Sequence, residues 1–301
     1  MDRIKDTVNI CYAANEAYSH CMMVSMYSLL VNADSERQYD ISIMYKDLNE
    51  ETVKKIISLQ DIRQGIKIHL IDVSEYDSLV SERTCTYITS ETNYRLFILG
   101  KMFEQYDRML YLDCDTVVCG NICELYDTEL NGKAVGVVEA MDHRYFSYTK
   151  KARFFENVPY NIDDYKTKVL RLSYPKEYFN GGVVLFDLNK SREIGDDAMA
   201  TEILNRHQYL YNDQDVLNIM FNEHKYMLDL KWNYTNEIEE YHTFTNEDMV
   251  EIYKDSYVDE FGIIHFVSGR KPWKYKTHLD EYYHKYEKQV CNYLKEKENE
   301  K

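Results

Sequence analysis

The sequence predicts an α/β protein with a mostly parallel central sheet. Three observations support this prediction: short apolar runs recur along the chain, helical or mixed segments separate them, and no linker-like stretch interrupts the 301 residues. Such alternation is typical of parallel strands joined by crossover helices, and a chain of this length can bury one large core. We therefore expect a single domain over residues 1–275 and a short helical tail over residues 276–301.

Six apolar runs are predicted to form the strands of this sheet. After the first run, Tyr18–Leu30 places Met22, Met26 and Leu29 at helical spacing, which indicates a crossover helix. Residues 142–178 lose this periodicity and are rich in Tyr, Phe and Lys, so we expect an excursion from the sheet over the functional site. The six predicted strands are Val8–Ala13, Ile41–Tyr45, Ile66–Val73, Met109–Leu112, Ala134–Glu139 and Val183–Phe186.

The chain carries a strong excess of acidic residues. With Lys+Arg 36 and Asp+Glu 52, its formal net charge is -16. Such a field repels nucleic-acid phosphates and anionic lipid headgroups, so we expect no nucleic-acid partner and at most weak peripheral contact with a membrane. A bound diphosphate would need a metal ion or local cations to offset the repulsion.

The composition also indicates a cytoplasmic protein without a transmembrane segment. Met1–Asp6 is charged, no apolar signal region follows it, and no apolar stretch approaches the ~20 residues that span a bilayer. The seven cysteines fit a reducing compartment better than a disulfide framework. Cys114, Cys119 and Cys123 lack the paired spacing of a zinc site and are interpreted as small apolar residues.

Two carboxylates follow the predicted strand Met109–Leu112. Asp113 and Asp115 stand two positions apart, so in extended backbone their side chains point the same way and can converge on one ion. Ligands of parallel sheets bind beyond the carboxyl ends of the strands, which is where both residues lie. Hard oxygen ligands suit Mg²⁺ or Mn²⁺, and an added imidazole favours Mn²⁺. The alternative is a pair of solvated acids that opens a loop.

Further segments with polar or glycine-rich patterns lie before and after this pair. In this order along the chain, the set resembles the family-eight retaining glycosyltransferases, which include glycogenin and bacterial galactosyl- and glucosyltransferases. The resemblance runs from about Val8 to Trp273 and implies a GT-A type domain that binds a nucleotide-sugar. The segments that carry it, besides Asp113–Asp115, are Ala14–Tyr18, Thr92–Leu96, Tyr178–Val183, Asn212–Asn218 and His265–Trp273.

The resemblance implies a UDP-sugar donor, UDP-glucose or UDP-galactose, and assigns residues to it. Asn15 would bond the uracil or ribose, and Tyr18 would stack on the base, with Ala14 in the same turn. Arg95 would reach the donor, although a surface arginine is the ordinary alternative. Cys114, between the two acids, is also assigned to the donor-binding set.

The last segment supplies further ligands in this resemblance. His265 would be the third protein ligand of the metal, Mn²⁺ or Mg²⁺, and Lys271 would neutralise the leaving diphosphate. Gly269 would offer a backbone amide to a phosphate. This glycine stands one place later than in the family, and Ser268 occupies the usual position.

The remaining assignments concern the reacting centre. Asn180, Asp213 and Gln214 would orient the sugar and the acceptor. Glu139 would bond hydroxyls of the donor sugar, with Asp142 as the alternative counterpart. Taken alone, Asn180 and its glycines resemble a plain turn, and Asp213 resembles a helix N-cap.

The implied reaction moves a hexose to an acceptor hydroxyl with retention of the anomeric configuration. The acceptor would be a glycan, a glycolipid or a glycoprotein, in cell-surface glycan or lipopolysaccharide-type synthesis. Gln214 stands where a double-displacement enzyme would need a nucleophilic carboxylate, and an amide is a poor nucleophile. The departing diphosphate could take the proton instead, as the hydroxyl arrives from the same face.

Two other functions fit part of the sequence. Asp113–Val117 also matches the Asp-x-Asp-x-Thr strand of haloacid-dehalogenase-like phosphatases, with Asp113 as the nucleophile. About a hundred residues of α/β pattern precede it here, whereas that motif usually opens those domains. The second alternative is an inactive module that only binds a nucleotide.

Overall fold

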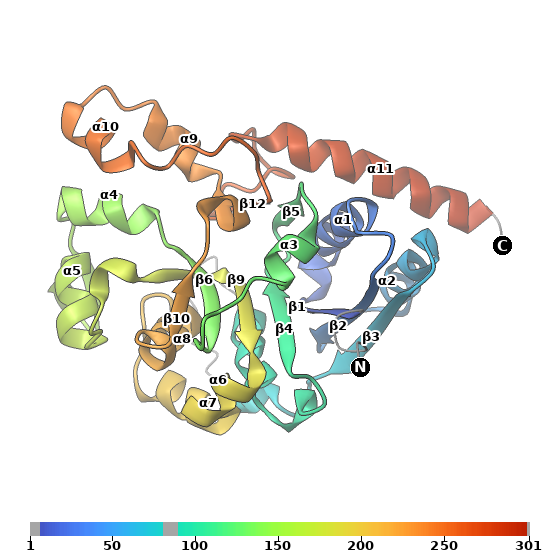
Figure 1. Ribbon diagram of the computed structural model, residues 1–301, viewed down its shortest axis with the longest axis horizontal. Coiled ribbons are helices and arrows are strands. Elements are labelled where there is room, and N and C mark those ends of the chain that lie inside the picture. The colour runs from blue at the N-terminus through green and yellow to red at the C-terminus, as the bar shows by residue number, and fades with distance from the viewer. Residues whose placement is uncertain (1–6, 81–89, 300–301) are drawn as a thin grey trace.

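The computed structural model describes residues 7–80 and 90–299 (Figure 1). Its main sheet has seven strands in the order β10-β6-β9-β4-β1-β2-β3, and four of the six neighbouring pairs are parallel. The mostly parallel α/β sheet that the sequence predicts is therefore confirmed. The strands are β1 (Thr7–Ala13), β2 (Gln38–Tyr45), β3 (Ile66–Asp72), β4 (Arg108–Leu112), β6 (Val135–Glu139), β9 (Phe179–Asp187) and β10 (Lys225–Met227).

Strand β9 is the exception to the parallel order. It lies between β4 and β6 and runs antiparallel to both. Its first residues therefore lie beside the carboxyl ends of its neighbours, and the Asp113 amide donates to Gly182 O at 2.8 Å. The register with β6 shifts between Val137 and Val138, so Gly181 and Gly182 are left out of that ladder. This placement brings the Asn180 segment next to the two acids.

Helix α1 (Glu16–Val31) is the predicted crossover helix and starts two residues earlier than expected. Asn15 caps it, because its side chain accepts a hydrogen bond from Tyr18 N at 3.0 Å. Helix α2 (Glu50–Ser58) lies beside it and is capped in the same way by Asn49.

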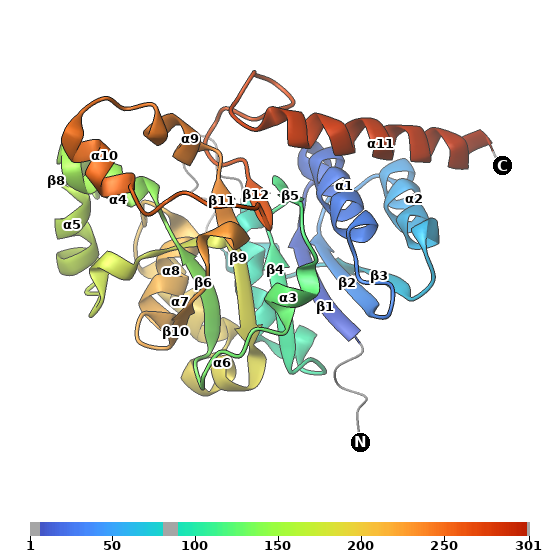
Figure 2. The same ribbon diagram turned by 45° about the horizontal axis from the view of Figure 1, so that its top comes forward.

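Helix α11 (Asp280–Asn299) packs along α1 (Figure 2). It buries Tyr283, Tyr286 and Val290 in the same hydrophobic cluster as α1. The expected helical tail is thus joined to the main body through a shared core. Within the described ranges, no helix is both long enough and apolar enough to cross a membrane.

The segment 142–178 leaves the sheet, as its lost periodicity indicates. It forms α4 (Asp142–Thr149), the ribbon β7 (Arg153–Phe155) and β8 (Val158–Tyr160), α5 (Ile162–Asp164) and a π-helical turn (Tyr165–Val169). The other helices are α3 (Ile122–Tyr126), α6 (Leu188–Ile194), α7 (Asp197–Arg206), α8 (Asn212–Phe221), α9 (Glu237–His242) and α10 (Glu247–Tyr253). Short 3₁₀ turns cover 59–62, 77–79, 90–99, 101–103, 175–177 and Leu230–Asn233.

A second, small sheet positions the last motif. Strand β12 (Ile263–His265) pairs with β5 (Thr116–Val118) on one side and with β11 (Tyr234–Thr235) on the other. His265 is thereby aligned with Thr116, the residue after Asp115. These strands are too short to give a periodic signal, and the sequence does not predict them.

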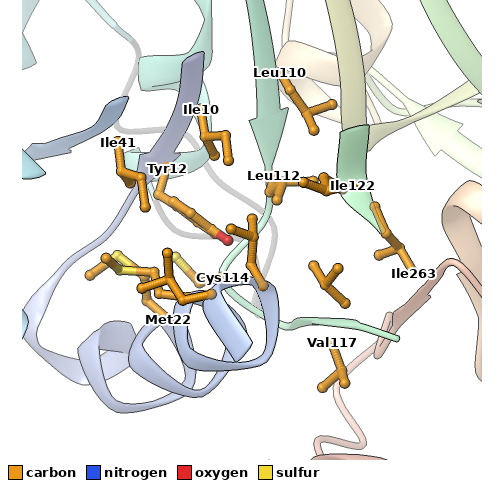
Figure 3. Packing of buried hydrophobic residues seen from close by; sticks show 14 of the residues in the cluster. Ile10, Tyr12, Met22, Ile41, Leu110, Leu112, Cys114, Val117, Ile122 and Ile263 are labelled. Carbon is orange, nitrogen blue, oxygen red and sulfur yellow. The ribbon is translucent and has the colours of Figure 1, made fainter. Parts of the chain in front are cut away.

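The two faces of the main sheet bury separate hydrophobic clusters. Alternation along each strand sends Ile10 and Tyr12 to the cluster under α1, and Cys11 to the other. Leu110 and Leu112 join the first cluster, in which strand side chains pack against Met22 of α1 (Figure 3). This packing fixes the carboxyl ends of β1 and β4.

Candidate active site

A cavity of about 260 Å³ lies at the carboxyl ends of β1 and β4, beside the first residues of β9. All predicted site residues except Glu139 and Gly269 line it. The predicted residues that it gathers are Ala14, Asn15, Tyr18, Arg95, Asp113, Cys114, Asp115, Asn180, Asp213, Gln214, His265 and Lys271.

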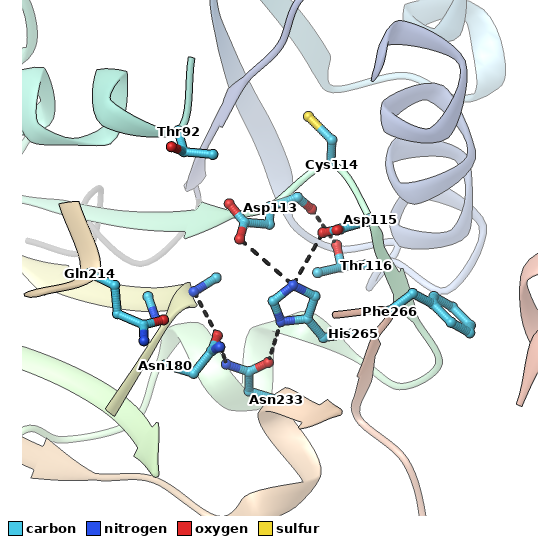
Figure 4. Close-up of polar contacts among 12 residues, drawn as sticks. Thr92, Asp113, Cys114, Asp115, Thr116, Asn180, Gln214, Asn233, His265 and Phe266 are labelled. Atoms are coloured by element: carbon cyan, nitrogen blue, oxygen red, sulfur yellow. Dashed lines mark hydrogen bonds and ion pairs between the residues drawn. The ribbon is translucent and has the colours of Figure 1, made fainter. Parts of the chain in front are cut away.

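Asp113, Asp115 and His265 converge on one side of this cavity (Figure 4). His265 Nε2 lies 3.1 Å from Asp115 Oδ1 and 3.7 Å from Asp113 Oδ2. One candidate ligand atom from each side chain falls within 4.8 Å of the others. His265 comes from β12 and the two acids follow β4, so the small sheet completes the group.

These three residues fit a divalent cation. Two carboxylates and an imidazole form a donor set suited to Mn²⁺ or Mg²⁺. Gly182 faces the same space, and a Cβ at this position would overlap both the His265 ring and the Asp113 carboxylate. The glycine therefore keeps open the room in which an ion would sit.

Lys271 adds a fixed positive charge. Its Nζ lies 2.5 Å from Asp115 Oδ2 and donates to Phe266 O at 2.7 Å. Burial alone would raise the pKa of Asp115, but Lys271 and His265 outweigh it and hold this pKa below its ordinary value. Asp115 is thus ionised at neutral pH, as a metal ligand must be.

Arg95 is a buried residue, so the surface alternative is wrong. It is 4% exposed and lies 4.6 Å above the ring of Tyr111. Its Nη2 donates to Asp113 Oδ1 at 2.8 Å, while Nε donates to Thr92 O and lies 2.7 Å from Asp213 Oδ2. Arg95 therefore links one predicted metal ligand to one predicted catalytic acid.

Gln214 and Asp213 lie in the first turn of α8. The helix N-cap is Tyr211, so the interpretation of Asp213 as a cap is wrong. Burial raises the pKa of Asp213 to about 6. Gln214 Oε1 accepts from Gly181 N at 2.9 Å, and its Nε2 donates to Tyr178 OH at 3.1 Å. Both polar ends of the Gln214 amide are thus already bonded.

The side chain of Asn15 makes one local hydrogen bond and one to a distant part of the chain. Besides capping α1, its Nδ2 donates to Glu91 Oε2 at 3.1 Å. Tyr18 also lines the cavity, with Trp273 edge-on at 5.9 Å. Glu91 lines it too, although no pattern in the sequence marks this residue.

The structure does not bring Glu139 and Gly269 into the cavity lining. Glu139 accepts two hydrogen bonds from Arg144, at 2.9 and 2.7 Å, whereas the alternative Asp142 does line the cavity. Ser268 lines it in place of Gly269 and has φ 67°. That left-handed conformation is the one glycine adopts most readily, in agreement with the usual place of the glycine in the motif.

Residues 142–178, expected over the functional site, do contribute to the cavity lining, but the sequence does not single out the individual side chains. Phe146, Arg153 and Glu237 line the cavity together with Asp142. Phe146 in α4 and Arg153 in β7 belong to the segment expected over the site, whereas Glu237 in α9 lies in a segment that no pattern marks. Asn233, which contacts His265 at 2.9 Å, is a further missed residue.

The chain resembles several known proteins over most of its length. Residues 9–277 match the family model described as Glycosyl transferase family 8. The chain is 24% identical over 293 residues to General stress protein A of Bacillus subtilis (strain 168), covering 94% of each chain. It is 27% identical over 277 residues to Lipopolysaccharide 1,2-glucosyltransferase of Escherichia coli (strain K12), covering 89% of this chain and 73% of that protein.

Two solved structures share the fold. The apo structure of the bifunctional glycosyltransferase WbbM has a TM-score of 0.82 and 20% identity over 97% of this chain, which spans 52% of that chain. The galactosyltransferase LgtC, in complex with donor and acceptor sugar analogs, has a TM-score of 0.73 and 19% identity, covering 94% of this chain and 96% of that chain. The expected GT-A type fold is confirmed by this likeness. Since the family model covers most of the chain, the protein belongs to glycosyltransferase family 8.

Proposed function

We propose that this glycosyltransferase moves a hexose from a UDP-sugar to an acceptor hydroxyl, with a divalent cation held by Asp113, Asp115 and His265. The convergence of these three side chains in the cavity, with Lys271 beside them, carries the proposal. The relatives named as lipopolysaccharide 1,2-glucosyltransferase and 1,3-galactosyltransferase support glucose or galactose as the sugar. They also support a role in cell-surface glycan or lipopolysaccharide-type synthesis. Family membership excludes the phosphatase alternative.

The chemistry of this site is stabilisation of the leaving group. When bound, Mn²⁺ or Mg²⁺ supplies a Lewis acid for the negative charge that grows on UDP. Lys271 provides a second cation on the same side of the cavity, and its ion pair with Asp115 holds its ammonium group near that site. Both charges offset the overall charge of -16, which otherwise repels a diphosphate.

Retention of configuration is the expected stereochemical outcome. Arg95 forms an ion pair with Asp213, and two hydrogen bonds fix the amide of Gln214 in place. Neither side chain is a free nucleophile, which favours a front-face route in which the departing diphosphate takes the acceptor proton. A product of inverted configuration would instead indicate a general base among the acids that line the cavity, Asp142, Asp213 and Glu237.

The part of the cavity lined by Asp142, Phe146, Arg153 and Glu237 fits the acceptor. The Arg153 guanidinium lies 3.9 Å above the ring of Phe146, and Asp142 and Glu237 line the same cavity. Planar polar groups beside an aromatic ring can bond hydroxyls and cover the apolar face of a sugar. We expect a glycan, a glycolipid or a glycoprotein glycan here. A cytoplasmic location with only weak peripheral membrane contact is part of this proposal, because the net charge repels anionic headgroups.

UDP release in the absence of an acceptor tests the proposal. The purified protein should hydrolyse UDP-glucose or UDP-galactose slowly when Mn²⁺ is present, and excess chelator should stop the reaction. Asp113→Ala and Asp115→Ala should lose activity while they keep their circular dichroism spectra. His265→Ala should lose less activity with Mg²⁺, which accepts water in place of the imidazole. Undiminished turnover in excess chelator would contradict the metal site, and no turnover of either donor would favour a binding module.

A further inference from the structure

A chain of three hydrogen bonds connects the predicted cation site with the predicted sugar site (Figure 4). The Gly182 amide donates to Asn180 Oδ1 at 2.8 Å, and Asn233 Nδ2 donates to the same oxygen at 2.9 Å. The other end of Asn233, Oδ1, lies 2.9 Å from His265 Nδ1. Asn233 is 1% exposed, so neither end can exchange its partner for bulk water.

The backbone fixes the direction of every bond in this chain. A backbone N–H can only donate, so the Asn180 atom that faces Gly182 is the oxygen. The Asn233 atom that faces this oxygen is therefore the NH₂ group, and its carbonyl oxygen is left for His265. An oxygen acceptor requires a proton on His265 Nδ1.

This direction leaves Nε2 as the nitrogen that faces the two acids. Nε2 lies 3.1 Å from Asp115 Oδ1 and 3.7 Å from Asp113 Oδ2. With Nδ1 holding its proton, Nε2 is the nitrogen whose proton a cation would replace, and its lone pair would then face the space shared with both carboxylates, as in a metal ligand. The opposite tautomer would point its N–H at that space and exclude a cation.

The local fold explains why residue 233 holds this position. Asn233 ends the 3₁₀ turn Leu230–Asn233, and strand β11 follows directly. In the pairing of β11 with β12, Thr235 lies opposite His265, and Asn236 N donates to His265 O at 3.1 Å. The backbone beside Asn233 is thus fixed to the backbone of His265.

We propose that Asn233 is a positioning residue that sets the Nδ1–H tautomer and ring orientation of His265 and, through the same amide, the orientation of Asn180. Asn180 Oδ1 already accepts two hydrogen bonds, so its Nδ2 is the end left to donate to a ligand in the cavity that Asn180 lines. One buried amide thereby aligns a cation ligand and a sugar contact. This inference rests on the proposed cation and donor sites.

Two variants separate the two ends of the Asn233 amide. Asn233→Asp keeps an acceptor for His265 Nδ1 but turns an oxygen toward Asn180 Oδ1. Asn233→Leu removes both contacts at similar volume. Asn236→Ala is the matched control, because it removes another buried asparagine of the same segment, whose Oδ1 has no hydrogen-bond partner among the described residues.

The first readout is the affinity for Mn²⁺ alone, measured by calorimetry well below the melting temperature of each variant. Asn233→Leu should bind Mn²⁺ roughly 10- to 100-fold more weakly, the usual cost of losing the partner behind a histidine ligand. Asn233→Asp and Asn236→Ala should bind it as the unmodified protein does. With a UDP-sugar, Asn233→Asp should instead show a lower kcat or a higher KM, because Asn180 is misdirected.

The second readout does not depend on a metal. The measurement is nitrogen-15 NMR of histidine-labelled protein, with the His265 signals identified from His265→Gln. Nδ1 should be protonated in the unmodified protein and in Asn233→Asp. In Asn233→Leu, the proton should no longer be confined to Nδ1. Unchanged tautomer and Mn²⁺ affinity in Asn233→Leu would overturn the inference, as would equal loss of Mn²⁺ affinity in Asn233→Asp. Absence of Mn²⁺ binding by the unmodified protein, with Nδ1 still protonated, would contradict the cation site and leave the tautomer control standing.

Discussion

Gly182 faces the Asp113 carboxylate so closely that a single added methyl group would overlap it. The same methyl group would overlap the ring of His265. Gly182 lies in β9, whereas Asp113 follows β4, and a backbone hydrogen bond of 2.8 Å from Asp113 N to Gly182 O joins the two segments. The backbone of β9 thus borders the space between Asp113 and His265, the two predicted ligands.

Gly182→Ala should therefore remove cation binding while leaving the chain folded. The added Cβ should cost about 1–3 kcal/mol of the free energy of unfolding, as overpacking does, and should displace His265 or Asp113. Calorimetry with Mn²⁺ and urea denaturation measure the two effects. Gly120→Ala is the control, because its Cβ would meet Gly262 Cα at an ordinary 3.6 Å. Tight Mn²⁺ binding by Gly182→Ala would show that the cation lies elsewhere.

Arg95→Met should destabilise the protein by about 3–5 kcal/mol, because it removes the cation shared by Asp113 and Asp213. Urea denaturation gives this value. Adding Asp213→Leu to this variant removes one of the two carboxylates left without a cation. The double variant should therefore lose less free energy of unfolding than the sum of the losses of the two single variants. Strict additivity would contradict the coupling.

The stability of the protein should depend on pH through Asp142. Burial and the nearby Glu237 raise the pKa of Asp142 to about 7 in the folded protein, while an unfolded chain titrates near ~3.9. Between these values the folded state binds more protons, so the contribution of Asp142 to the free energy of unfolding falls as pH rises from about 4 to about 7. Asp142→Asn removes this loss, and its stability relative to the unmodified protein should be higher at pH 8 than at pH 4.

Asp163 offers a control of opposite sign. Burial raises its pKa, but the hydrogen bonds from Lys150 and Ser147, at 2.6 Å each, outweigh burial and lower it. Its contribution is fully present above the unfolded pKa of ~3.9 and is lost as pH falls below it, so the stability of Asp163→Asn relative to the unmodified protein should fall between about pH 2 and pH 5 and stay constant above that. Urea denaturation of both variants from about pH 2 to pH 8 tests the pair, and parallel stability curves for the two would refute the assignment.

We expect the segment Ala14–Tyr18 to select the nucleotide base. Tyr18 lines the cavity next to the Asn15 amide, which is held by Glu91. We expect UDP to bind more tightly than GDP by ~2 kcal/mol, because a purine would leave buried polar groups without partners. Calorimetry with Mn²⁺ present compares the two. Tyr18→Ala should weaken UDP binding and reduce the difference in affinity between UDP and GDP. Equal affinities of the unmodified protein for UDP and GDP would show that this segment does not recognise the base.

Much of the main sheet can be predicted because strands such as β4 and β6 are buried along nearly their whole length and appear as apolar runs. The direction of β9 cannot, since Val183–Phe186 reads the same in either orientation. The strands β5, β11 and β12 are two or three residues long and carry no period. They form because His265 and Thr116 are brought together by the rest of the fold.

The candidate site shows the same division. Asp113 and Asp115 can be found from their spacing after a strand, and His265 from its place in a longer motif. Glu139 has the expected residue type at the expected strand end, but Arg144 holds its carboxylate. Asn233 has no sequence signal, because its role depends on which of its two amide ends meets which neighbour in the folded protein.

The contact between α1 and α11 sets an order of events during synthesis. Asn32, next to the end of α1, donates to Tyr286 OH at 2.8 Å across 254 positions of the chain, and Val290 of α11 is fully buried in the cluster that α1 shares. A nascent chain therefore carries the first helix of this fold with one apolar face uncovered until residue 290 has left the ribosome. Chains emerge at about 5–20 residues per second, so this face stays exposed for on the order of tens of seconds. During that interval it is an apolar surface of the kind that chaperones bind.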